Sequence, residues 1–139
     1  MLLGINANLT PDLLHSLAAM GHGDQIAIVD CNFPSATCAR RVYYLPGLDA
    51  VAMLEAVLSV LPLDTFVPSP SASMQVVGDA AAIPPAVQDF AAVLARVGFK
   101  PPEMLERFAF YEAAKQTFAI VQTGERRPYG NIILTKGVI

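Results

Sequence analysis

The chain has 139 residues, of which 54% are hydrophobic and only 15% charged, and its formal net charge is −3. Typical globular domains carry about 25% charged residues, so this composition and a mean hydropathy of +0.47 are unusual for a small soluble monomer. The length fits one domain, residues 1–139, and the nine scattered basic residues form no stripe that would bind nucleic acid.

The surplus of apolar residues has two candidate explanations: a membrane protein, or a subunit that buries surface against copies of itself. A spanning helix needs about 20 largely apolar residues, whereas the best segment, residues 48–61, is shorter and contains Asp49 and Glu55. Residues 1–6 lack the basic and long apolar regions of a secretory signal. We therefore expect a cytoplasmic homo-oligomer without membrane contact, because permanent subunit interfaces resemble a core cut in half.

The first third of the chain predicts a helix followed by a buried strand. The Thr-Pro-Asp triplet at residues 10–12 is typical of a helix start, and Gly21 is typical of a helix end. Residues 25–30 contain a continuous apolar run, as in strands buried on both faces of an α/β sheet. This strand ends at Asp30, and a loop is expected over residues 31–39.

The middle of the chain continues the alternation of strands and helices. A short strand is expected over residues 42–45, followed by a helix over 49–61 that is apolar almost all round and is stopped by Pro62. Prolines and serines indicate a loop over residues 62–72, with a strand after it over 74–77.

The last third predicts two helices and two strands. A helix begins at the proline pair 84–85 and ends at Gly98, with apolar residues spaced along one face. A further helix is expected over 110–117, and strands over 118–122 and 132–134. Because strands and helices alternate, the sequence predicts a layered α/β/α single domain around a central mixed or mostly parallel sheet.

Two residues at the ends of the first strand are candidates for chemistry. His22 lies between Gly21 and Gly23, which allow a backbone that exposes the side chain or lets a ligand approach, although a helix cap and an incidental surface histidine explain the same pattern. Asp30 ends a strand at the edge where α/β sheets form crevices, and its alternative role is to cap a turn. His15 is expected to be an ordinary surface residue.

Later candidates have equally plain alternatives. Arg107 precedes a run of aromatic residues and could contact a sugar, but an ion pair with Glu103 or Glu106 would explain it as well. The Tyr-Gly-Asn sequence at 129–131 could form part of a site or only a turn.

The two cysteines indicate no metal centre. Cys31 and Cys38 lie close together in one expected loop, without further ligands at the spacing of a zinc site. Free thiols in a reducing compartment are the expectation.

Five stretches, in order and over the whole chain, resemble the L-fucose mutarotase family. They are MGHGD at 20–24, DCNFP at 30–34, RFAFYE at 107–112, TGE at 123–125, and YGNIIL at 129–134 with KGV at 136–138. The related D-ribose pyranases share the histidine, the aspartate and the Tyr-x-Asn pattern but differ around 23 and 107–112. The chain is therefore similar to the fucose branch, although Cys31 and Asn32 stand where some relatives carry Ala and His.

The resemblance implies an isomerase that interconverts the α and β anomers of a free aldose, above all L-fucose, without cofactor or metal. It implies that His22 is the proton donor and that the substrate is bound by Asp30, Arg107, Tyr129, Gly130 and Asn131. Ring opening and closing need positioned acid–base groups, and histidine titrates near neutrality. Pyranose–furanose interconversion of D-ribose and sugar binding without catalysis remain alternatives, as does a structural ring-forming protein with a vestigial pocket.

The order of residues also predicts where the site lies. His22 precedes the first strand and Asp30 follows it, so an extended chain would separate them by about 20–25 Å. The resemblance implies large rings with pockets at subunit boundaries, and a neighbouring subunit would bring the two ends together. A loop within one subunit is the alternative way to close the gap.

Overall fold

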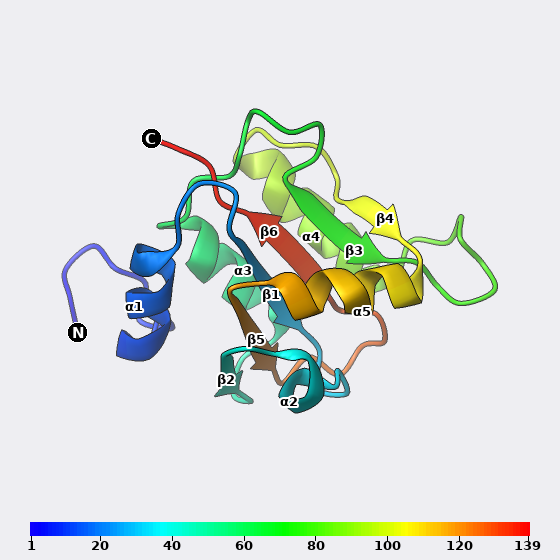
Figure 1. Ribbon diagram of the computed structural model, residues 1–139, viewed down its shortest axis with the longest axis horizontal. Coiled ribbons are helices and arrows are strands. Elements are labelled where there is room, and N and C mark those ends of the chain that lie inside the picture. Colours follow the sequence, from blue (N-terminus) through cyan, green and yellow to red (C-terminus); the bar gives the residue numbers. More distant parts are fainter.

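A mixed six-stranded sheet forms the centre of the computed structural model, which describes residues 1–139 (Figure 1). In sheet order the strands are β2 (Val42–Leu45), β5 (Ala119–Thr123), β1 (Gln25–Val29), β6 (Ile132–Thr135), β3 (Ser71–Met74) and β4 (Glu103–Leu105). Neighbouring strands are parallel, except that β6 is antiparallel to both β1 and β3. The predicted mixed sheet is therefore confirmed.

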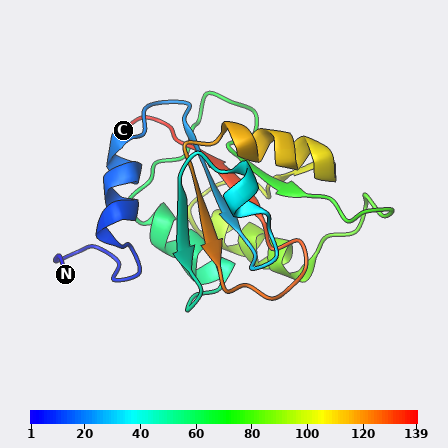
Figure 2. The same cartoon turned by 60° about the horizontal axis from the view of Figure 1, so that its bottom comes forward.

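Helices cover both faces of this sheet. They are α1 (Pro11–Ala19), α2 (Ser35–Cys38), α3 (Ala50–Leu58), α4 (Pro85–Arg96) and α5 (Arg107–Gln116). Figures 1 and 2 show α3 and α4 on one face and α2 and α5 on the other. The layered α/β/α arrangement is thus confirmed. None of these helices combines the length and the apolarity that crossing a bilayer requires.

Successive residues of β1 supply two separate cores. Ile26 and Ile28 pack in a larger cluster with α1, α3 and α4, whereas Ala27 and Val29 pack in a smaller cluster with α2 and α5. All four side chains are fully buried, which explains why the strand reads as a continuous apolar run rather than as an alternating pattern.

Side-chain caps begin three of the helices. Thr10 accepts the amide of Leu13 at the start of α1, and Asp49 accepts the amide of Ala52 at the start of α3. Glu106 accepts the amides of both Phe108 and Ala109, so α5 begins at Arg107 rather than at the expected residue 110. A carboxylate satisfies amides that have no partner within the helix.

Two strands differ from the expectation. β3 lies at Ser71–Met74, so it begins three residues before the expected strand and takes in the last two residues of the expected loop. β4 at Glu103–Leu105 has no counterpart among the predicted elements. Neither strand has a strong apolar pattern, because β3 contains two serines and β4 has only three residues. β3 pairs with both β4 and β6, and this pairing provides backbone hydrogen bonds that the local sequence pattern does not predict.

The strand directions decide where functional residues gather. The parallel strands β1, β3, β4 and β5 end at one edge of the sheet, and the antiparallel β6 begins at that same edge. The loops that follow these four parallel strands therefore lie at the same edge as the loop that precedes β6.

Candidate functional site

A small polar hollow lies at the edge where the parallel strands end. Asp30 directly follows β1, Arg107 follows β4, and residues 129–131 directly precede β6. The hollow has a volume of about 250 Å³. It is lined by Asp30, Asn32, Phe33, Met74, Arg107, Tyr111, Pro128, Tyr129 and Asn131. Four of the five expected sugar-binding residues are thus brought together from three separate parts of the chain.

Asp30 is the buried acid of this hollow. It is 5% exposed, its amide donates to Asn131 Oδ1 at 2.9 Å, and its own Oδ1 accepts the amide of Asn32 at 2.9 Å. Burial raises the pKa of the Asp30 carboxyl, and donors from Asn32, Asn131, Gly130 and Phe33 partly offset that effect. The side chain both caps the turn and faces the hollow, so the two alternative roles occur together.

Arg107 supplies the positive charge of the hollow. It is the first residue of α5. It forms no ion pair with Glu103 or Glu106, so the alternative explanation of Arg107 as a surface ion-pair residue is wrong. Its guanidinium carbon lies 4.6 Å from the centroid of the Phe108 ring. Its Nε is buried and has no hydrogen-bond partner in the chain, so the guanidinium retains donors for a ligand.

The loop before β6 is held in an unusual conformation. Tyr129 has φ = 61°, in the left-handed region that side chains other than glycine rarely adopt. Its hydroxyl accepts the amide of Val77 at 3.2 Å, and its carbonyl accepts the amide of Asn131 at 2.8 Å. Gly130 is buried behind the hollow rather than lining it, and a Cβ there would lie 2.6 Å from Glu125 Cγ. Only a glycine fits, and its backbone amide faces Asp30.

Aromatic and apolar side chains form one wall of the hollow. Phe33 and Tyr111 lie with ring centroids 5.5 Å apart, and Met74 joins them at the end of β3. Phe108, the first aromatic residue after Arg107, is 61% exposed and does not line the hollow. Phe33 and Tyr111 could have been singled out from the stretches 30–34 and 107–112, whereas Met74 could not, because its strand was misplaced.

His22 lies apart from these residues, in the turn between α1 and β1. Its Nε2 is 3.3 Å from Asp64 Oδ2, and its ring packs edge-on against Phe66 with centroids 5.6 Å apart. The His22 side chain is 48% exposed and that of Asp64 only 3%. Asp64 was missed from the sequence; the signal was a lone acid in a loop of prolines and serines.

The end of β6 holds this second group of residues in place. The carbonyl of Lys136 accepts the amide of Gly23 at 2.8 Å, and the amide of Lys136 donates to the carbonyl of Asp24 at 2.9 Å. The amide of Asp64 donates to the carbonyl of Thr135 at 3.0 Å. His22 and Asp64 therefore share one scaffold, at the edge of the sheet opposite the hollow.

A single chain does not unite the two groups. β1 separates His22 from Asp30, and its five residues span about 16 Å at ~3.3 Å per residue. Two larger hollows, of about 540 and 590 Å³, are lined mainly by apolar residues of α1 and the chain ends. They lack the converging polar groups that hold a sugar.

Comparison with known proteins gives consistent results over the full length. Residues 3–139 match the model of the RbsD / FucU transport protein family. The "Fucose mutarotase" of Bos taurus is 44% identical over 145 residues, which cover 100% of this chain and 95% of that protein. The fucose mutarotase from Streptococcus pneumoniae, solved in complex with L-fucose, has a TM-score of 0.93 at 39% identity and 99% coverage of both chains. Bacillus subtilis RbsD, solved with D-ribose, has a TM-score of 0.69 at 23% identity, covers 94% of this chain and 95% of its own, and shows the shared fold alone.

Proposed function

The chain belongs to the RbsD / FucU family, and on that premise we propose that it is an isomerase that interconverts the α and β anomers of L-fucose. The observation that carries the proposal is the meeting of Asp30, Arg107, Tyr129 and Asn131 in one hollow. The fucose mutarotases it resembles, one of them solved with L-fucose, match over nearly their whole length. The D-ribose complex is too distant in sequence to favour a pyranase.

The proposed roles follow from the chemistry of ring opening. The ring oxygen must gain a proton while the anomeric hydroxyl loses one, and a histidine exchanges protons near neutral pH. His22 is the proposed proton donor. Its Nε2 faces Asp64, which orients the imidazole and leaves Nδ1 without a partner in the chain. Asp64 is therefore proposed as a positioning residue for His22.

The hollow supplies the contacts expected of a sugar site. Asp30, Arg107 and Asn131 offer a carboxyl, a guanidinium and an amide to the sugar hydroxyls. Tyr129, Tyr111 and Met74 offer apolar surface, which suits the methyl group of a 6-deoxy sugar. Gly130 contributes by its backbone, because its position leaves no room for a side chain.

We further propose a homo-oligomer, in the form of a ring, whose active sites are shared between subunits. The separation of His22 from Asp30 supports sharing, since each edge of the sheet holds only part of the chemistry. Apolar side chains exposed at the chain ends and beside His22 support an interface; they are Met1, Leu2, Leu3, Phe66, Val138 and Ile139. Exposed apolar patches of this kind mark contact surfaces.

A cytoplasmic location is proposed as well. Cys31 is exposed and Cys38 buried, and neither forms a disulfide. Free cysteines, one of them open to solvent, are suited to a reducing compartment.

Saturation-transfer NMR on equilibrated L-fucose tests the function. With a catalytic amount of protein, irradiation of one anomeric proton should reduce the signal of the other anomer. The rate of this saturation transfer should exceed the rate measured without protein. Absence of added transfer would exclude the proposed activity. Transfer with D-ribose but not with L-fucose would indicate the pyranase activity instead.

A further inference from the structure

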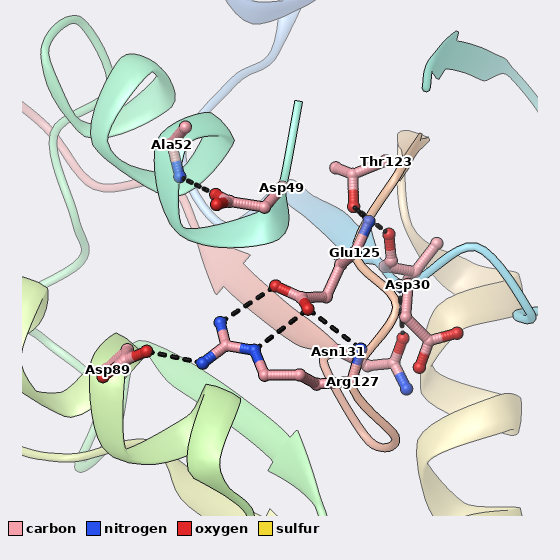
Figure 3. A network of polar contacts seen from close by, with 9 residues as sticks. Asp30, Asp49, Ala52, Asp89, Thr123, Glu125, Arg127 and Asn131 are labelled. Carbon is pink, nitrogen blue, oxygen red and sulfur yellow. Dashed lines mark hydrogen bonds and ion pairs between the residues drawn. The ribbon is translucent and has the colours of Figure 1, made fainter. Parts of the chain in front are cut away.

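An ion pair between the buried Glu125 and the partly exposed Arg127 lies directly behind the loop that carries Tyr129 and Asn131. Glu125 is 4% exposed, and Arg127 binds it through two parallel contacts, Nε to Oε1 and Nη2 to Oε2, both 3.0 Å long. The backbone amide of Arg127 also donates to Oε1 at 3.0 Å. Figure 3 shows the guanidinium facing the Glu125 carboxylate. Such forked contacts fix both distance and orientation.

The pair anchors the loop to the body of the protein. Arg127 Nη1 donates to Asp89 Oδ2 of α4 at 2.7 Å, so one guanidinium connects the loop with a helix on the far side of the sheet from α5 (Figure 3). The neighbouring Arg126 is exposed and forms no ion pair. Of these two adjacent arginines, only Arg127 is fixed by ion pairs, with Glu125 and Asp89.

The same pair reaches both halves of the sugar hollow without entering it. The carbonyl of Glu125 accepts the amide of Cys31 at 2.9 Å, immediately after Asp30. The side chain of Glu125 fills the space where Gly130 would otherwise carry a Cβ. Neither Glu125 nor Arg127 lines the hollow. Their influence on a sugar therefore acts through the residues that they hold.

The loop needs such support. A tyrosine with φ = 61° is strained, and strained residues persist only when their surroundings hold them in place. Tyr129 is two residues beyond the fork of Arg127, and Asn131 reaches from the loop to the amide of Asp30 at 2.9 Å. A change in the fork would alter the position of both side chains.

We propose that Glu125 and Arg127 are positioning residues that hold Tyr129 and Asn131 in their sugar-binding geometry. They set the affinity for the sugar and leave the proton transfer at His22 largely unaffected. The inference rests on the proposed function for its consequence in catalysis, but the positioning of the loop is a property of the sugar-free protein.

A purely structural role makes a different prediction. If the pair only stabilised the fold, its loss would reduce the fraction of active protein, so the apparent kcat would fall while KM stayed unchanged. Loss of positioning raises KM and the Kd for L-fucose, while kcat changes less. The two roles therefore separate in the kinetics.

Kinetics and binding of Arg127→Lys and Arg127→Met, with Arg126→Met as the matched control, test the proposal. Lysine keeps the charge but loses the fork. We expect Arg127→Met to raise KM and Kd about tenfold or more, with kcat within about threefold of wild type. The KM and Kd of Arg127→Lys should lie between those of wild type and Arg127→Met, and those of Arg126→Met should equal the wild-type values. A lower kcat at unchanged KM in both Arg127 variants would overturn the proposal.

A sugar-free measurement separates this proposal from the function. In ¹⁵N NMR spectra, Arg127→Lys should shift or broaden the amides of Tyr129, Gly130 and Asn131, while Arg126→Met should not. Unchanged loop amides in folded Arg127→Lys would refute the positioning role. Should Arg127→Met fail to fold, Asp89→Ala, which removes only the outer contact, should cause a smaller shift of the same amides. If the wild-type protein does not interconvert the anomers of L-fucose, the proposed function is wrong. The amide shifts would still show whether Glu125 and Arg127 position the loop.

Discussion

At the scale of single residues, two buried carboxyls differ because of their neighbours. Burial dominates at Asp30 and raises the pKa of its carboxyl. At Glu125 the hydrogen bonds from Arg127 dominate and hold the pKa of the carboxyl below its usual value of 4.5. The Asp30 carboxyl has amide donors but no cation in contact, whereas the Glu125 carboxyl has a forked guanidinium. Glu125 therefore stays ionised as the partner of Arg127, whereas Asp30 faces the hollow without a cation bound to it in the chain.

His22 provides the sharpest residue-scale prediction. His22→Ala should lower turnover by roughly 10²–10⁴-fold, the usual contribution of a positioned acid or base, while Kd for L-fucose changes little. His15→Ala is the matched control, because His15 is exposed on α1 and makes no comparable contact. Saturation-transfer rates and a binding titration give both quantities.

The role of Asp64 is tested in the same assay. Asp64→Asn keeps the size of the side chain but removes the charge that faces Nε2 of His22. It should lower turnover less than His22→Ala does and alter the pH profile of kcat. Equal, small effects of His22→Ala and His15→Ala would contradict the assignment of the proton donor, and an unchanged pH profile in Asp64→Asn would contradict the positioning role.

At the scale of elements, the start of α5 determines where Arg107 lies. Glu106 accepts two backbone amides of the first turn, at 2.9 and 3.1 Å, and the helix therefore begins directly at Arg107. The first turn of the helix then presents the guanidinium to the hollow. A cap residue outside the hollow thus contributes to the site.

Removal of this cap should have two measurable effects. Glu106→Ala should lower the free energy of unfolding by about 1 kcal/mol, the usual loss for a capping side chain, and should weaken L-fucose binding because the first turn frays. Urea unfolding and a binding titration measure these effects. Glu103→Ala, an exposed change on β4, is the control and should alter neither. Unchanged affinity in Glu106→Ala would show that Arg107 does not depend on the cap.

At the scale of the whole molecule, the sheet separates two groups of candidate site residues. His22 and Asp64 are held beside the end of β6, while Asp30 and its neighbours lie beside its beginning. Four of the five residues of β1 are fully buried, and this strand keeps the two groups apart within one chain. In the shared site that we propose, a second subunit supplies the other half.

Mass and complementation test this arrangement. Light scattering should give a mass several times 14.8 kDa that persists on dilution below micromolar concentration. Co-refolding of inactive His22→Ala with inactive Asp30→Ala should restore part of the activity, because some shared sites then combine two intact halves. A stable, active monomer would exclude the oligomer, whereas an oligomer without complementation would exclude only the shared site.

Local sequence was sufficient for the parts of this protein whose signals lie within a few residues. The capped start of α1, the apolar pattern of α3, the continuous apolar run of β1 and the alternation of strands and helices predicted the layered fold correctly. The candidate site residues came from motifs that resemble a known family, and four of the five expected sugar-binding residues line one hollow.

Tertiary structure alone decided the rest, because the deciding contacts join distant segments. β3 forms by pairing with β4 and β6, and β4 forms by pairing with β3; neither strand has a strong apolar pattern of its own. Asp64 meets His22 across about 40 residues of sequence, and the antiparallel direction of β6 brings Asn131 to Asp30. Hydrogen bonds and burial at such separations depend on how the sheet is ordered, which local propensity does not encode.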